Sequence, residues 1–147
     1  MLYYDTSVLL KLYTQEPESP SVRAFVLARQ ERIPFHSLHH SECTSALELK
    51  AFRGECSREQ AARALADVED DLARRILVPV DVDWIAAWRL CREMARAFAA
   101  ETGCRTLDTL HLACARSLAI RDIVTTDARQ QQLAERVGMR AMSPVGS

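Results

Sequence analysis

The sequence of 147 residues contains no apolar run long enough to cross a membrane, no low-complexity segment and no long block of like charges. The first absence excludes a helical membrane protein, and charged residues at 27% without long blocks argue against global disorder. The first residues lead into a strand pattern and not into a signal peptide. We therefore expect one cytoplasmic domain over residues 1–144, followed by a short tail at 145–147, with no membrane partner.

Lysine is rare in the sequence. Of the 19 basic residues, only Lys11 and Lys50 are lysines, and the others are arginines. The formal net charge is −1, so the chain has no global basic excess that would attract nucleic acid. Any contact with RNA must come from a local patch or through a metal ion. Arg89, Arg92 and Arg96 recur on one face of a predicted helix, where they could meet phosphates or an acidic partner, or form an ordinary solvated face.

Paired metal-binding cysteines are also missing. The five cysteines are odd in number, and no two have the C-x-x-C spacing of zinc or redox sites. This pattern indicates reduced, mostly buried thiols, as in a reducing compartment. His36, His39, His40 and Glu42 lie close together in sequence but match no known zinc-binding spacing.

What the sequence does contain is a regular alternation of strand and helix patterns. The clearest strands are continuous apolar runs, which are typical of a parallel sheet covered on both faces. The pattern predicts an α/β fold, a three-layer α/β/α sandwich with a mostly parallel central sheet. We expect strands at 2–4, 32–36, 76–80, 123–126 and 139–142, and helices at 7–13, 19–29, 38–53, 57–75, 83–102, 106–119 and 127–137.

Two aspartates follow predicted strands directly. Asp5 ends the first strand and Asp127 follows the fourth. Ligands of open parallel sheets bind beyond the carboxyl ends of the strands, so both are candidate site residues. Each also has a simpler explanation, since Asp5 could cap the helix after it, and Asp127 with Gln130 forms a capping-box pattern.

Two further carboxylates lie on helix faces that we expect to be buried. Glu42 shares a face with Ala46, Leu49 and Phe52, which we interpret as the core-facing stripe of its helix. Asp108 opens a helix that is apolar almost all round, although an acid in a first turn also complements the helix dipole. A charged side chain is rarely placed toward a core without a partner, which favours a functional role.

If the four carboxylates share one rim, their charges need compensation. Two charges about 4 Å apart repel by roughly 4 kcal/mol at an effective dielectric near 20. An all-oxygen set favours Mg²⁺ or Mn²⁺ over zinc, and such an ion supports phosphodiester cleavage. Ser7 and Thr125 each stand two residues from an aspartate and could orient it, or could serve only as a cap and as a strand residue.

The order of these motifs resembles that of PIN-domain ribonucleases, and more narrowly of VapC-type toxins of type II toxin–antitoxin modules. No single motif is specific, but their order and flanks match from residue 1 to about residue 144. The motifs are Asp5-Thr6-Ser7, Ser41-Glu42, the segment 107–113 around Asp108 and His111, Val124-Thr125-Thr126-Asp127, and Gly138 before the last strand.

The resemblance implies a metal-dependent endoribonuclease that cleaves RNA with Mg²⁺ or Mn²⁺ and leaves 5′-phosphate and 3′-hydroxyl ends. It implies that the four acids named above hold the metal and catalyse, with the two hydroxyl residues in support. It also implies a homodimer inhibited by a small VapB-like antitoxin that covers the acidic pocket. The chain departs from the pattern at Gln130, where many relatives carry an aromatic residue.

Several alternatives stay open. The fold could be a catalytically degenerate module that binds RNA or protein. A phosphatase with Asp5 as nucleophile would need a second acid at the position of Ser7. We expect His111 to be a buried, hydrogen-bonded structural residue, and we leave open whether Trp84 and Trp88 belong to the core or to a dimer contact.

Overall fold

The structure is a computed structural model that describes residues 1–145, so residues 146 and 147 of the predicted tail lie outside the described part. Within residues 1–145, no helix combines the length and apolarity needed to span a bilayer. The strands are β1 (Tyr3–Tyr4), β2 (Ile33–Phe35), β3 (Leu77–Pro79), β4 (Asp122–Val124) and β5 (Arg140–Met142). The helices are α1 (Thr6–Tyr13), α2 (Ser19–Arg29), α3 (Ser37–Phe52), α4 (Arg58–Ala73), α5 (Trp84–Thr102), α6 (Thr106–Ser117) and α7 (Ala128–Arg136).

The strands pair in parallel. β4 lies between β1 and β5, and β2 pairs with β3 as a second ladder beside β1. The backbone N–H of Asp5 still donates to Val124 O at 3.0 Å, so the β1–β4 pairing reaches the first residue after the strand. The predicted parallel arrangement is confirmed, and the carboxyl ends of β1 and β4 meet at one edge.

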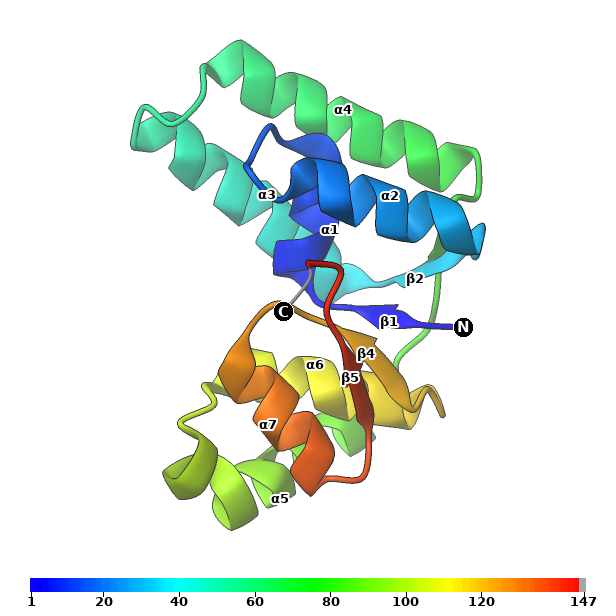
Figure 1. Cartoon of the computed structure of the whole chain (residues 1–147), viewed down its shortest axis with the longest axis vertical. Coiled ribbons are helices and arrows are strands. Elements are labelled where there is room, and N and C mark those ends of the chain that lie inside the picture. The colour runs from blue at the N-terminus through cyan, green and yellow to red at the C-terminus, as the bar shows by residue number, and fades with distance from the viewer. Residues whose placement is uncertain (146–147) are drawn as a thin grey trace.

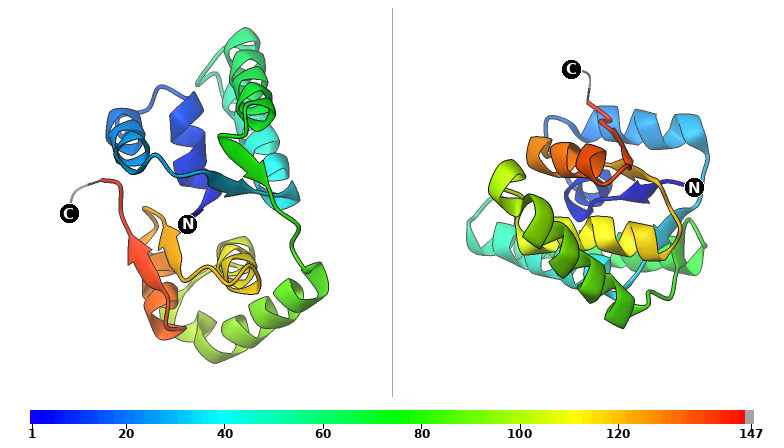
Figure 2. Two further views of the ribbon diagram at one scale, coloured as in Figure 1. Left: turned by 90° about the vertical axis from the view of Figure 1, so that its right-hand side faces the viewer. Right: turned by 90° about the horizontal axis from the view of Figure 1, so that it is seen from below.

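Helices cover both faces of the strands, with α1 to α4 on one side and α5 to α7 on the other (Figures 1 and 2). Successive strand residues point to opposite faces, and the core follows this rule. Tyr3 and Ile123 pack into the cluster beneath α5 to α7, whereas Tyr4 and Val124 pack into the cluster beneath α1 to α4. The predicted three-layer sandwich is confirmed.

Local capping signals explain most helix boundaries. Ser57 and Gln60 form a capping box at the start of α4, with reciprocal bonds of 3.0 and 2.8 Å, and Asp83 caps α5 through the N–H of Ala86 at 2.9 Å. Helix α2 begins at the expected residue, but Ser19 does not cap it. Its N-cap is Glu18, because the hydroxyl of Ser19 instead donates to a loop carbonyl.

Helix α3 faces the core with a stripe that we did not predict. Its buried residues are His39, Cys43 and Leu47, whereas Leu49 is 44% exposed and Phe52 is 88% exposed. The predicted core-facing stripe through Glu42 was therefore wrong. The helix carries apolar residues on two faces, and its packing against α1 and α4 selects the other one.

The cysteines are free thiols, and all five lie in the described residues. Four are buried, and Cys56 is partly exposed. Burial raises the pKa of Cys43 and of Cys114 to about 12. The thiols of Cys43 and Cys114 are therefore protonated and shielded.

The tryptophans at the start of α5 occupy different environments. Trp84 packs against the core and meets the His36 ring edge-on at 5.5 Å between centroids. Trp88 is 49% exposed and Ile85 beside it is 86% exposed. Trp84 is therefore mainly a core residue, and Trp88 belongs to the surface.

Candidate active site

Three of the four candidate carboxylates line one pocket. Asp5 stands at the end of β1, Glu42 on α3 and Asp108 in the first turn of α6, and together they line a hollow of about 330 Å³. Elements far apart in the sequence thus place their acids at the same edge of the strands. The remaining lining residues are Thr6, Ser7, Leu10, Ser45, Ala46, Leu49 and Leu107.

Asp5 is both a helix cap and a pocket residue. Its Oδ2 accepts from the backbone N–H of Ser7 at 3.1 Å and from the Ser7 hydroxyl at 2.5 Å. The carboxylate is only 7% exposed. The two explanations drawn from the sequence are therefore compatible, and Ser7 donates to Asp5, while a supporting role of Ser7 in a metal site stays a prediction.

Glu42 is fixed by two donors on its Oε2. Thr6 donates through its hydroxyl at 2.5 Å, and His111 donates through Nε2 at 2.6 Å. Burial disfavours the charged form, but these hydrogen bonds outweigh it and lower the pKa of the Glu42 carboxyl. Glu42 is therefore ionised and held in one orientation at neutral pH.

A buried hydrogen-bonded chain lies behind Glu42. The Tyr3 hydroxyl is 2.8 Å from His111 Nδ1 and 2.8 Å from His36 Nε2. Since one hydroxyl donates only once, Tyr3 donates to one imidazole and accepts from the other. His111 has the buried, hydrogen-bonded environment that we predicted, but it also links this chain to the site. Nothing in the sequence indicated that Tyr3 and His36 would belong to this hydrogen-bonded chain. Tyr3 is an ordinary strand residue and His36 is the N-cap of α3, and both roles are explained locally.

The carboxyl group of Asp108 lies in a partly buried and negatively charged environment. Burial first, and then the carboxylates of Asp5 and Asp127, raise the pKa of its carboxyl group. Arg105 Nε lies 3.6 Å away and only partly offsets this. A raised pKa at this position indicates that the acids crowd one another electrostatically.

Asp127 is the N-cap of α7. Its Oδ1 accepts from the N–H groups of Arg129 and Gln130 at 2.7 and 3.3 Å, while Thr125 Oγ1 accepts from the Asp127 N–H at 3.1 Å. It does not line the pocket described above, although its charge acts on Asp108. Roles in metal binding for Asp127, and in support for Thr125, stay predictions.

Gln130 is a site residue that sequence reasoning missed. The capping-box pattern predicts that the Gln130 side chain accepts from the backbone N–H of Asp127 at the N-terminus of its own helix. Instead it is 1% exposed, and its Nε2 donates to Asp5 Oδ1 at 3.3 Å and to the backbone carbonyl of Asp108 at 3.0 Å. No local signal could have revealed these contacts, because both partners are more than 20 residues away.

The donor chemistry fits a hard divalent cation. The pocket offers carboxylate and hydroxyl oxygens, and Asp108 is both partly buried and close to the negative charges of Asp5 and Asp127. Within residues 1–145, however, no three His, Cys, Asp or Glu side chains stand close enough to hold an ion together. Mg²⁺ commonly uses one or two protein carboxylates and keeps its waters, so Asp5 and Asp108 fit it without a closed cage.

The neighbouring histidines His39 and His40 contact different parts of the fold. His40 lies 2.7 Å from Glu69 on α4, where it forms an exposed ion pair when protonated. His39 Nε2 meets the carbonyl of Tyr4 at 2.9 Å. The two side chains thus have separate partners.

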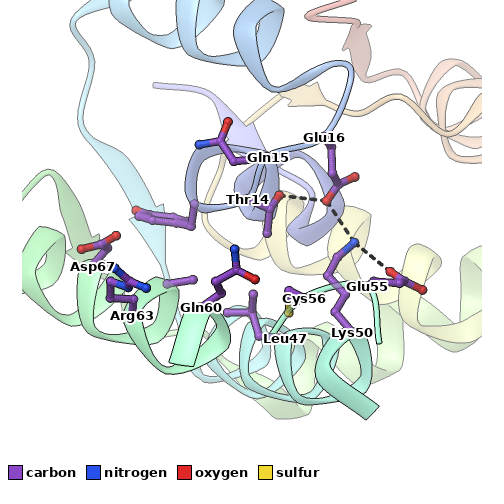
Figure 3. Close-up of a pocket in the computed structure, with 12 residues that line it drawn as sticks. Thr14, Gln15, Glu16, Leu47, Lys50, Glu55, Cys56, Gln60, Arg63 and Asp67 are labelled. Carbon is purple, nitrogen blue, oxygen red and sulfur yellow. Dashed lines mark hydrogen bonds and ion pairs between the residues drawn. The ribbon is translucent and has the colours of Figure 1, made fainter. Parts of the chain in front are cut away.

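A second pocket of about 260 Å³ lies between the end of α1, α3 and α4. Figure 3 shows Lys50 between Glu16 and Glu55, with N–O separations of 3.2 and 3.3 Å. Thr14 also donates to Glu16 at 2.8 Å. Lys50 and its two acidic neighbours therefore neutralise one another in this hollow.

The chain is similar to known proteins along nearly its whole length. A family model described as "PIN domain" matches residues 2–136. "Ribonuclease VapC46" from Mycobacterium tuberculosis is 33% identical over 145 residues, which cover 97% of either chain.

Solved structures share the fold at lower identity. "FitAcB from Neisseria gonorrhoeae" matches with a TM-score of 0.64 and 16% identity, over 98% of both chains. The "DNA bound VapBC from Salmonella typhimurium" matches with a TM-score of 0.64 and 20% identity, over 98% of both chains. A "VapBC2 from Rickettsia felis" bound to a promoter fragment gives 0.64 and 16%, over 97% of this chain and 98% of that one.

Proposed function

The chain belongs to the PIN-domain family, and from this premise we propose that it is a metal-dependent endoribonuclease, the toxin of a toxin–antitoxin module. The observation that carries the proposal is the convergence of Asp5, Glu42 and Asp108 on one pocket. The relative named as a ribonuclease supports the substrate class.

The ion would be Mg²⁺ or Mn²⁺, held by Asp5 and Asp108, with Glu42 and Asp127 adding charge around it. When bound, such an ion activates water and stabilises the leaving oxygen of an in-line phosphodiester displacement. We infer these metal roles from the oxygen-only donor set and from the mutual repulsion at Asp108.

The side chains around the pocket fix the acids before any substrate arrives. Ser7 holds one oxygen of Asp5, while Thr6 and His111 hold one oxygen of Glu42. A preorganised set of charges costs no reorganisation during the reaction. Thr6 and His111 both bind Oε2 of Glu42, so its Oε1 is not engaged by either donor. Through Oε1, Glu42 can orient a water molecule or a hydroxyl group of the substrate.

We also propose a VapB-like antitoxin as partner. Several similar solved structures are of VapBC or FitAB complexes bound to DNA. In this chain the pocket wall includes Leu49 and Leu107, which are 44% and 46% exposed beside the acids. Such a surface suits a peptide that carries apolar residues and a positive charge.

A homodimer and a cytoplasmic location complete the proposal. Exposed apolar side chains on α5, Ile85 and Trp88, offer a surface for a second copy. Free thiols at all five cysteine positions suit a reducing compartment.

The proposal is tested by cleavage of single-stranded RNA in Mn²⁺, with Asp5→Asn, Asp108→Asn and the exposed control Asp70→Asn. We expect wild type and the control to cleave, and EDTA to stop both. Each site variant should be slower by about 100-fold or more, which corresponds to roughly 3 kcal/mol of transition-state stabilisation. Unchanged cleavage by both site variants would contradict the proposal, and absence of cleavage by folded wild type would favour the binding module.

A further inference from the structure

Gln130 connects three segments that carry candidate acids. It stands in the first turn of α7, three residues after Asp127, and its side chain points away from that helix into the interior. Its amide nitrogen donates to Asp5 Oδ1 at 3.3 Å and to the carbonyl oxygen of Asp108 at 3.0 Å. One side chain thus joins β1, α6 and α7.

The amide can serve these contacts in only one orientation. Both neighbours are acceptors, a carboxylate and a carbonyl oxygen, so the NH₂ group must face them. With the amide reversed, Gln130 Oε1 would oppose two other oxygens. The orientation that avoids this leaves Oε1 buried and without a hydrogen-bond partner among the described residues. A buried unpaired acceptor is unfavourable, so the two contacts of the Gln130 nitrogen must offset this cost.

Asp5 is consequently held through both of its oxygens. Ser7 binds Oδ2 from the start of α1, and Gln130 binds Oδ1 from the opposite side. The second bond of the Gln130 amide goes to the backbone of Asp108, and not to its carboxylate. Gln130 therefore fixes the backbone of Asp108 relative to Asp5 without occupying the Asp108 carboxylate, whose Oδ2 lies 3.6 Å from Arg105 Nε.

We propose that Gln130 is a positioning residue that sets the spacing of Asp5 and Asp108 for a divalent cation. This inference rests on the proposed function, since it concerns the same site. Gln130 does not contact the reacting groups in this role. It acts by holding two acids at the separation that an ion shared between them requires.

A purely structural role would have different consequences. The cap of α7 does not depend on the side chain of Gln130, because Asp127 accepts from the N–H groups of the first turn and the Asp127 N–H donates to Thr125. A filler of the core would affect stability alone, whereas a positioning residue must affect metal affinity.

The test compares Gln130→Met with Gln132→Met. Methionine keeps the length of the side chain and removes its donor. Gln132 stands on the same helix and is exposed, so it controls for the change in composition. Gln130→Asn is a second variant, which keeps an amide but withdraws it by one methylene. Mn²⁺ affinity is measured by calorimetry on the full chain, together with the melting temperature without metal and RNA cleavage against Mn²⁺ concentration.

We expect Gln130→Met and Gln130→Asn to bind Mn²⁺ about 10- to 100-fold more weakly than wild type. Saturating Mn²⁺ should restore most of the cleavage rate, and Gln132→Met should match wild type. Wild-type Mn²⁺ affinity in both folded Gln130 variants overturns the positioning role alone. If wild type itself binds no Mn²⁺, the proposed function fails and the role of Gln130 fails with it.

Discussion

His111 Nε2 lies 2.6 Å from Oε2 of Glu42, and this contact joins helix α6 to helix α3 directly beside the acidic pocket. The same imidazole meets the Tyr3 hydroxyl through Nδ1 at 2.8 Å. Burial alone would lower the pKa of His111, but the hydrogen bond to Glu42 and the nearby carboxylates outweigh it and raise that pKa. The imidazole thus links the core to the site.

Replacing His111 by Phe should destabilise the protein without metal. The ring volume is kept, but Glu42 and Tyr3 each lose a buried partner, which costs about 1–3 kcal/mol of unfolding free energy. Urea denaturation measures the change. The matched control is His40→Phe, since His40 forms only an exposed pair with Glu69, and loss of such a pair costs less than about 1 kcal/mol. Equal stability of both variants would show that the buried contact contributes nothing.

The stability of the protein should fall in mild acid because of His36. Burial, and then the charge of His111, lower the pKa of His36 to about 4. The unfolded chain takes up a proton below about pH 6.5, whereas the folded protein does so only near pH 4. The unfolding free energy should therefore decrease as pH falls through this window, by roughly 3 kcal/mol from this residue.

Denaturant titrations at several pH values test this, with wild type against His36→Gln. The variant should lose less stability between pH 6.5 and pH 4. It should keep part of the slope, because burial also lowers the pKa of His39. If the unfolding free energy of His36→Gln depended on pH as steeply as that of wild type, His36 would have the same pKa in the folded and unfolded states, which would contradict the prediction.

Neutralising Asp108 should have opposite effects with and without metal. Burial and the charges of Asp5 and Asp127 raise its pKa, so the ionised form is disfavoured in the folded protein. Asp108→Asn should therefore melt at a higher temperature than wild type in EDTA at pH 7. In Mn²⁺ the wild type should gain stability, about 2.7 kcal/mol at 100 times the dissociation constant, and the variant should gain little. A full Mn²⁺-induced rise in the variant would exclude Asp108 as a metal ligand.

Cys56 should be the first thiol to react with an alkylating reagent. It is the partly exposed cysteine, whereas Cys43, Cys91, Cys104 and Cys114 are buried and burial raises the pKa of each of these four. Thiolates are the reactive form, so these four should react only on unfolding. Mass spectrometry after brief labelling checks this, and Cys56→Ser should remove the fast phase. Early modification of Cys43 would contradict the described core.

The layers of the fold could be predicted because they follow from local signals. The continuous apolar strands, the capping box at Ser57 and the cap at Asp83 are local signals. Each one specifies a strand or the start of a helix through residues only a few positions apart in the sequence. The acids at strand ends were informative for a similar reason, since parallel strands bring Asp5 to the edge where α3 and α6 also place carboxylates.

Other features depend on contacts that no short segment encodes. Gln130 follows a capping-box pattern, yet its amide contacts Asp5 and Asp108 instead. The face of α3 was misjudged because two apolar stripes compete on one helix, and tertiary packing buries the one with Leu47 and exposes Phe52. The link from Tyr3 to His111 spans 108 positions, so only the assembled fold reveals it.

The central claim is that acids from distant segments form one metal-dependent RNA-cleaving site, with Asp5 at its centre. The most direct measurement maps the 5′ ends of cellular RNA after induction of wild type and of Asp5→Asn, with both proteins shown to be folded and equally abundant. We predict new 5′-monophosphate ends at defined positions with wild type and none with Asp5→Asn. The same new ends with both proteins would contradict the account.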